Sequence, residues 1–314
     1  MPSYVFFRNK IVPLAEAKIG VMTHALHYGT ALFEGIRGNW NSKQKQIYIF
    51  RLKEHYERML NGCRVLKIDL PYSLDELCRI TVKVVEKCAF QEDIYIRPLA
   101  YKSSEALGVR LHDLENDFLV FAIPWGRYLD TDKGKCGVSS WRRPEDNMIP
   151  PQIKVAGIYV NNAFAKTEAI ENNYDEAIML SPDGHVSEGS GENIFLVING
   201  KLVTPSAYSN ILMGITRNTV IELAQKELGV ATEERLVDRS ELYTARECFL
   251  TGTAAHLTPI TEIDHRLVGD GEIGPVTRKL QQIYSDVIRG NKPKYLKWCT
   301  PAYKKKPTGA RQKR

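Results

Sequence analysis

The stretch VSEGSGENIFLV, residues 186–197, runs from a glycine-containing loop into the apolar segment IFLV, which is typical of a buried strand. Two carboxylates, Glu188 and Glu192, lie in the loop. A surface turn can use glycine and small polar residues, but it does not need acids that lead directly into a core strand. The stretch therefore raises the question of which positive group a carboxylate meets at the edge of the core.

The composition indicates a globular protein of one large or two medium domains, since 43% of the 314 residues are apolar and 25% are charged. The six cysteines are scattered and form no C-x-x-C pair, which disfavours zinc fingers and redox motifs and favours reduced cysteines. The longest apolar run, FLVFAIPW at 118–125, is far shorter than the roughly 20 residues that span a bilayer. We expect a cytoplasmic protein without a membrane span.

The net charge of +6 comes from the C-terminal end of the chain. Residues 292–314 carry nine Lys or Arg and no acid, so subtracting nine leaves the first 291 residues at −3. The Pro, Gly and Lys content of this segment predicts a flexible, basic tail. We expect the tail to keep the protein in solution rather than to bind nucleic acid.

Hydrophobic periodicity predicts an α/β (α+β) protein with two domains. Apolar runs predict strands in the first part at 47–50, 93–101 and 118–125, and an apolar stripe predicts a helix from Leu52 to Leu60 with Arg58 at its edge. In the second part, strands are predicted at 177–180, 194–197 and 247–252, and helices at 216–228, ending at Gly229, and from Pro275. The expected division is a small N-terminal domain (1–125), a polar linker (126–135) and a larger domain (136–291), with a ligand site between the domains.

Three further segments could carry chemistry. Lys154 lies in PPQIKVAGIYV (150–160) between prolines and an apolar run, which would bury part of the amine, although most lysines reach water along an apolar stem. The loops MGITRNTV (213–220) and LTGTAAHLTP (250–259) offer backbone N–H groups to an anion, but similar turns are common. Neither loop contains the GK[ST] of a nucleotide P-loop.

A lysine that forms an imine, two phosphate-binding loops and an acid that faces a protonated pyridine are together what pyridoxal phosphate requires. The plain alternative is that Glu188 only caps a turn. The seven histidines form no HExxH metal motif, and the loop around Ser190 lacks the G-x-S-x-G of a hydrolase.

Six segments, in order and spacing, resemble the branched-chain amino acid aminotransferases of the class IV, fold-type IV pyridoxal phosphate family: HALHYGTALFEGIR (24–37), YIRPL (95–99), FAIPWGRYL (121–129), SEGSGENIF (187–195), GITR (214–217) and TGTAAHLTPI (251–260). The resemblance covers about residues 5–290. It implies a small N-terminal α/β domain, a larger C-terminal α/β pseudo-barrel, and the transamination of L-leucine, L-isoleucine and L-valine with 2-oxoglutarate. The alternative is another fold-type IV enzyme, which would act on D-amino acids, amines or aminodeoxychorismate. The charged segment RLHDLEND (110–117) departs from the pattern of bacterial relatives.

The resemblance also implies roles for particular residues. Lys154 would bind the cofactor as an imine and act in catalysis, Glu188 would meet the pyridine nitrogen, and Tyr159 would bond the phenolic oxygen. The phosphate would be held by Arg58, Ile215, Thr216 and Thr253. Glu192 would support the loop.

For the substrate, the resemblance implies that Tyr95 and the N–H groups of Thr253 and Ala254 meet the α-carboxylate. Aromatic side chains would wall an apolar pocket, namely Phe33, Trp125, Tyr128 and Tyr159. Arg97, two residues after Tyr95 on the same strand face, would receive the γ-carboxylate of glutamate together with Tyr28. Tyr28 and Val109 would come from a second subunit, so the expected assembly is a homodimer at least, or a hexamer built as a trimer of dimers.

Overall fold

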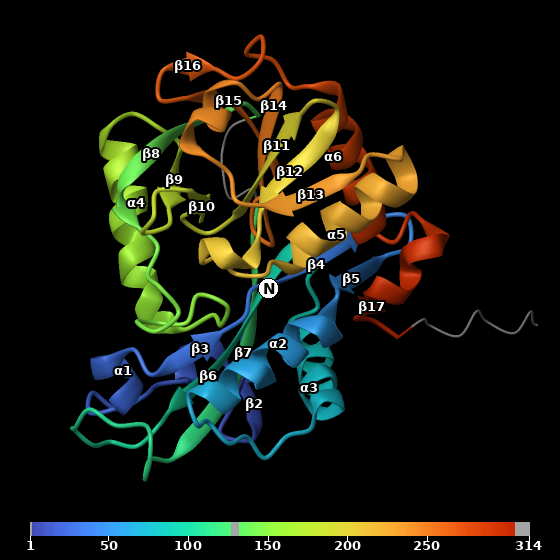
Figure 1. Cartoon of the computed structure of the whole chain (residues 1–314). Helices are drawn as coiled ribbons and strands as arrows, with labels where there is room; N and C mark the ends of the chain where they lie inside the picture. Colours follow the sequence, from blue (N-terminus) through green and yellow to red (C-terminus); the bar gives the residue numbers. More distant parts are fainter. Residues whose placement is uncertain (1, 127–131, 305–314) are drawn as a thin grey trace, which may run out of the picture.

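The computed structural model describes residues 2–126 and 132–304, and two β-sheets organise them (Figure 1). The first sheet has the strand order β17-β5-β4-β6-β7-β1-β2, with β3 paired to β6, and every pairing in it is antiparallel. Its strands are β1 (Tyr4–Phe7), β2 (Lys10–Pro13), β3 (Ala31–Phe33), β4 (Ile36–Asn41), β5 (Gln46–Phe50), β6 (Ile94–Lys102), β7 (Asn116–Pro124) and β17 (Cys299–Pro301).

Helices α2 (Leu52–Val65) and α3 (Leu74–Cys88) cover the first sheet, whose other helical segments are η1 (Leu14–Glu16) and α1 (His24–Tyr28). The predicted stripe on α2 is confirmed: Leu52, His55, Tyr56 and Met59 are buried, and Leu60 is half-buried against the same core. A capping box starts α3, since the Ser73 hydroxyl accepts from the Glu76 N–H and the Glu76 carboxylate accepts from the Ser73 N–H.

The second sheet is mixed, with the order β10-β9-β8-β15-β14-β11-β12-β13 and β16 paired to β15. Its strands are β8 (Gly134–Arg142), β9 (Glu176–Leu180), β10 (Val186–Gly189), β11 (Asn193–Ile198), β12 (Lys201–Pro205), β13 (Thr232–Arg235), β14 (Glu247–Gly252), β15 (His256–Ile263) and β16 (Arg266–Leu267). The pairs β8–β9, β8–β15 and β12–β13 are parallel.

Helix α4 (Tyr159–Glu171) packs on β8 and β9, whereas α5 (Ile215–Leu223) packs on β14, and α6 (Pro275–Ile288) packs on β14 and β15 and also touches β5 (Figure 1). The remaining helical segments are η2 (Ala156–Ile158), η3 (Ala207–Ser209), η4 (Ala224–Leu228), η5 (Arg239–Tyr243) and η6 (Pro293–Trp298). The predicted helix at 216–228 is found as α5 and η4 together, and it ends at Gly229, whose φ of 66° is the left-handed conformation that glycine adopts without strain. Among the described residues, no helix is long and apolar enough to cross a membrane.

The chain passes from the first sheet to the second between Pro124 and Gly134, within the predicted linker. The last two residues of that linker are already strand, because Gly134 pairs with Ile260 and Lys135 with Glu262. The linker prediction is therefore wrong for Gly134 and Lys135, and its residues 127–131 lie outside the described part of the chain.

The prediction of a flexible tail from residue 292 is wrong for residues 292–304. Here η6 buries Tyr295 and Trp298, and β17 then pairs with β5 at the edge of the first sheet. The two aromatic rings belong to a core cluster that contains Phe50 of β5 and Tyr284 of α6. The helical segment and the strand in residues 292–304 are too short to show a helical or strand period. Sequence patterns therefore did not reveal that this segment packs against the core.

This packing predicts that the C-terminal segment stabilises the fold. Trp298→Ala removes a buried ring from the cluster between the sheets, and we expect a loss of about 3–5 kcal/mol in the free energy of unfolding. Lys297→Ala, at the exposed neighbouring position, is the matched control and should change little. Equal stability of the two variants in urea denaturation would show that the segment does not hold the fold together.

Candidate active site

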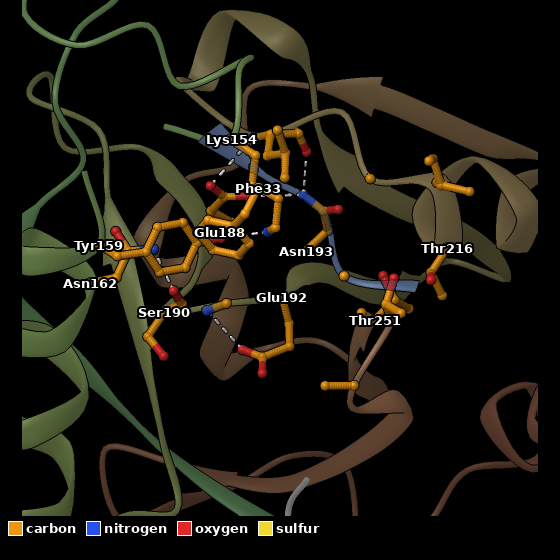
Figure 2. Close-up of a pocket in the computed structure, with 18 of the residues that line it drawn as sticks. Phe33, Lys154, Tyr159, Asn162, Glu188, Ser190, Glu192, Asn193, Thr216 and Thr251 are labelled. Carbon is orange, nitrogen blue, oxygen red and sulfur yellow. Dashed lines mark hydrogen bonds between the residues drawn. The ribbon is translucent and has the colours of Figure 1, made fainter. Parts of the chain in front are cut away.

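A cavity of about 360 Å³ gathers eleven of the fifteen residues for which the resemblance implies contact with the cofactor or the substrate, and Glu192 lines it as well. The eleven come from both sheets and are Phe33, Arg58, Tyr95, Arg97, Lys154, Tyr159, Glu188, Ile215, Thr216, Thr253 and Ala254. Tyr28, Val109 and Trp125 do not line this cavity, and Tyr128 lies outside the described residues. The cavity is therefore the candidate active site (Figure 2).

Lys154 reaches the cavity from a segment that is fixed to β3. The Phe33 N–H donates to the Lys154 carbonyl at 3.1 Å, and Val155 forms a bridge with Leu32. The half-buried amine donates to the Tyr159 hydroxyl at the start of α4 and lies 5.2 Å from the centre of the Phe33 ring (Figure 2). The amine is thus held between two aromatic rings with its nitrogen directed at one hydroxyl.

Glu188 lies near the end of β10 as a buried carboxylate with several donors around it. One oxygen lies 2.9 Å from Nη2 of Arg143, and the other accepts from the Asn193 side chain at 2.9 Å. The Leu212 N–H donates to both oxygens, at 3.3 and 3.1 Å. Burial raises the pKa of Glu188, although the Arg143 charge and the Leu212 N–H oppose the shift. A further positive group in the cavity would therefore relieve the cost of burying this anion.

Arg143 and Asn193 are site residues that the sequence analysis missed. Arg143 is buried and also donates to the Asn162 side chain at 2.8 Å. Asn193 also donates to the Leu212 carbonyl at 2.8 Å, which joins the strand β11 to the loop before α5. The glycine at position 214 leaves room for the Asn193 side chain, because a Cβ there would lie 2.0 Å from the Asn193 side-chain oxygen. Asn193 follows the glycine loop directly and could have been noticed there, whereas Arg143 lies in no motif.

One end of the cavity is suited to an anion. Helix α5 begins at Ile215 and Thr216, and the first N–H groups of a helix have no partner within the helix. Arg58 lines the same cavity and donates from Nη1 to the carbonyl of Met213, just before α5. Thr253 and Ala254 follow β14 in the turn on the cavity wall. A cation and a helix N-terminus together favour a phosphate.

Glu192 is the second carboxylate of the opening stretch, and it is buried beneath the glycine loop. Its oxygen accepts from the Gly191 N–H at 3.1 Å (Figure 2). Burial, together with the nearby Glu176 carboxylate, raises the pKa of Glu192 to about 8. The environment of Glu192 thus favours the uncharged carboxyl, whereas Arg143 favours the charged form of Glu188.

At another part of the wall, Tyr95 and Arg97 lie on the same face of β6, as their spacing predicted. Nη2 of Arg97 donates to the Tyr95 hydroxyl at 3.1 Å, and the guanidinium lies 4.3 Å from the centre of the Phe33 ring. Gly35 leaves room for that hydroxyl, since a Cβ there would lie 2.1 Å from it. Trp125 is not a lining residue, but its ring lies 5.4 Å from that of Tyr95.

Tyr28 and Val109 lie together on the surface, away from the cavity of their own chain. The Tyr28 hydroxyl accepts from the Gly108 N–H at 3.0 Å. The side chains are 37% and 91% exposed, respectively, and the same two segments carry further exposed apolar residues, namely Ile19, Val21, Met22, Leu26 and Leu107. An exposed apolar patch of this kind is typical of a protein interface.

Comparison with known proteins agrees with this geometry. A model of the amino-transferase class IV family matches residues 31–263. A probable branched-chain-amino-acid aminotransferase of Aquifex aeolicus is 54% identical over 303 residues, which are 96% of this chain and 97% of that protein.

Solved structures match over nearly the whole chain as well. The branched-chain amino acid aminotransferase of Thermobaculum terrenum in its PLP-form superposes with a TM-score of 0.92 at 38% identity, covering 96% of this chain and 99% of that one. The branched-chain aminotransferase of the thermophilic archaeon Thermoproteus uzoniensis with norvaline also gives a TM-score of 0.92, at 42% identity, covering 96% of this chain and 100% of that one.

The cavity of this chain suits pyridoxal phosphate. An amine for covalent attachment, a buried carboxylate that gains from a cationic ring, and a cationic end with free helix N–H groups all face one space. The fold, the site and the similarity of sequence agree, and the chain belongs to the class IV aminotransferases, in the group of the pyridoxal-phosphate-dependent branched-chain amino acid aminotransferases.

Proposed function

We propose that the protein transfers the amino group of L-leucine, L-isoleucine or L-valine to 2-oxoglutarate, in a reversible reaction of two half-reactions in branched-chain amino acid metabolism. The observation that carries the proposal is the convergence of Lys154, Glu188 and Arg58 on one cavity that also has aromatic walls and a second arginine, Arg97. Bound pyridoxal phosphate supplies an electron sink for the charge that develops when a substrate loses its α-proton.

In this proposal Lys154 holds the cofactor through its amine and is also the base. The Nζ of Lys154 would take the proton from the substrate Cα, and it would return a proton to that carbon in the reverse half-reaction. The Tyr159 hydroxyl accepts from this amine and orients it. Glu188 keeps the proton on the pyridine nitrogen, and Arg143 and Asn193 fix the carboxylate for that purpose.

The phosphate end would be held by Arg58, by the N–H groups of Ile215 and Thr216, and by Thr253. The support is the short helix α5, which points its N-terminus at the cavity that Arg58 lines. These contacts would bind and orient the phosphate, which takes no part in the bond changes. One positive charge and several directed N–H groups are sufficient for that role.

The substrate would place its α-carboxylate against the Tyr95 hydroxyl and the N–H groups of Thr253 and Ala254. Branched side chains would pack on the rings of Phe33 and Tyr159, with Trp125 behind Tyr95. Glutamate would need a cation for its γ-carboxylate, because an unpaired charge in an apolar pocket is costly. Arg97 can supply that cation, since it lines the cavity with its guanidinium beside the Phe33 ring.

The active assembly is proposed to be a cytoplasmic homodimer. Tyr28 and Val109 lie on an exposed apolar surface of the chain rather than in its own cavity, which suits their delivery to the cavity of a second copy. Tyr28 would then share the γ-carboxylate with Arg97. A hexamer would need a further interface between such dimers.

Coupled assays with 2-oxoglutarate test the proposed function. L-Leucine should give glutamate at a rate far above that of D-alanine, because the side-chain pocket and the α-carboxylate contacts together select one configuration at Cα. A preference for D-alanine, or activity restricted to primary amines, would contradict the proposal and favour another enzyme of the class IV family.

Lys154→Ala should abolish turnover, since the same amine binds the cofactor and moves the proton. The steady-state kcat with L-leucine and 2-oxoglutarate is the measurement, and Lys53→Ala, at an exposed lysine of α2 outside the cavity, is the control. A Lys154→Ala variant that retains a sizeable fraction of wild-type kcat would remove Lys154 from both roles.

Arg97→Leu should weaken glutamate and 2-oxoglutarate much more than leucine and its oxo acid. Loss of one charge-assisted contact typically costs about 1.5–3 kcal/mol, or roughly 10- to 100-fold in affinity. Half-reactions with each amino acid alone isolate the effect, and Arg97→Lys, which keeps the charge, should lose less. Equal losses for both substrates would mean that Arg97 organises the wall instead of binding the γ-carboxylate.

A further inference from the structure

Glu34, between β3 and β4, is a fully buried carboxylate that has no role in the proposed chemistry. It meets Arg58 through two parallel bonds, Nε to Oε1 and Nη2 to Oε2, both at 2.8 Å. Behind it, Nδ1 of His55 lies 2.7 Å from Oε2. A buried carboxylate that is bound on two sides is held far more rigidly than a surface ion pair.

The charges in this cluster are fixed. Burial alone would raise the pKa of Glu34, but the charge of Arg58 and the hydrogen bonds from Arg58 and His55 lower it to about 2. Burial lowers the pKa of His55, so the imidazole is neutral and donates its Nδ1–H to a carboxylate that can only accept. Burial likewise opposes the charge on Arg58, yet Glu34 outweighs it and raises the pKa of the guanidinium. The cluster therefore carries one negative charge, one positive charge and a neutral donor.

The bonds also determine which way Arg58 faces. A guanidinium has five N–H groups, and Glu34 takes two of them while the Met213 carbonyl takes a third from Nη1 at 3.0 Å. One N–H on Nη1 and one on Nη2 then remain without a hydrogen-bond partner among the described residues. Since Met213 precedes Gly214, the residue before α5, this bond places Nη1 of Arg58 close to the helix N-terminus that faces the cavity.

We propose that Glu34 is a positioning residue, which fixes Arg58 so that its two remaining N–H groups are directed at the phosphate of the cofactor. The inference rests on the proposed role of Arg58. A free arginine side chain loses rotamer entropy when it is immobilised. Because Glu34 already holds Arg58 in place, that entropy is lost before the cofactor binds and does not weaken the binding. His55 completes the arrangement by holding the carboxylate from behind.

A different role for Glu34 would be to neutralise a buried cation for the sake of stability. The two roles give opposite expectations for Glu34→Gln. If Glu34 only cancels charge, its loss raises the positive potential of the cavity and the phosphate binds more tightly. If Glu34 sets the direction of Arg58, its loss frees the guanidinium and the phosphate binds more weakly.

The test compares the affinities of the full-length protein, dialysed free of cofactor, for pyridoxal phosphate and for pyridoxal, which lacks the phosphate. Glu34→Gln should weaken pyridoxal phosphate by about 10-fold or more, the usual effect of a lost charge-assisted contact, and leave pyridoxal unchanged. Glu57→Gln, the same change at an exposed position beside Arg58 on α2, should alter neither affinity.

A double-mutant cycle assigns the effect to Arg58. Arg58→Met should also lower the ratio of the two affinities, and Glu34→Gln added to it should cause no further loss. An unchanged ratio in Arg58→Met would contradict the phosphate role of Arg58 itself. A lowered ratio in Arg58→Met with an unchanged or raised ratio in Glu34→Gln would overturn the role of Glu34 alone.

Glu34→Asp keeps the proposal testable if Glu34→Gln does not fold. Aspartate retains the charge but is one methylene shorter, so it cannot reach both Arg58 nitrogens and His55 in the same geometry. The ratio should fall here too, whereas a wild-type ratio in Glu34→Asp would overturn the inference in favour of simple charge compensation.

Discussion

The ion pair between Glu188 and Arg143 is the interaction on which the rest of the site depends. A buried carboxylate is costly unless several donors meet it, and here an arginine, an asparagine and a backbone N–H do so at 2.9–3.3 Å. The donors come from the residue after β8, from the start of β11 and from the loop before α5. The same contacts that hold the anion therefore hold three segments around one side of the cavity.

A second constraint is that the cavity is assembled from two sheets. Arg58 is carried by α2 on the first sheet, whereas Ile215 and Thr216 start α5 on the second. Their distance depends on the packing between the sheets, where Phe50, Tyr284 and Trp298 form part of one cluster. Arg51 strengthens the junction: its N–H donates to the Trp298 carbonyl at 2.7 Å, and its side chain reaches Glu222 of α5 at 3.2 Å. The C-terminal segment thus belongs to the packing that sets the distance between Arg58 and the start of α5, although it lies outside the cavity.

Sequence patterns correctly predicted those features that lie within a single helix or strand. The buried stripe on α2 follows from the 3.6-residue period of a helix, and the shared face of Tyr95 and Arg97 follows from the two-residue period of a strand. The end of η4 follows from the helix-ending glycine, Gly229. The eleven cavity residues expected to contact cofactor or substrate were also recognisable in the sequence, because their motifs resemble those of a known family.

Long-range partners could not be predicted in this way. Arg143 meets Glu188 across 45 positions of sequence and Glu34 meets Arg58 across 24, and no local rule connects either pair. The packing of Tyr295 and Trp298 was missed for a similar reason, because a short 3₁₀ turn followed by a three-residue strand has too few residues to show a period. Sequence patterns thus identified many of the groups that face the cavity, and the structure was needed to find those that hold them in place.

The central claim is that Glu188 keeps a proton on the pyridine nitrogen of the bound cofactor. Nitrogen-15 NMR of the holoenzyme, reconstituted with cofactor labelled at that nitrogen, measures this directly. The account predicts a protonated nitrogen in the wild type and a change to the unprotonated chemical shift in Glu188→Gln, where a neutral amide replaces the anion. An unprotonated nitrogen in the wild type, or the same chemical shift in both proteins, would contradict it.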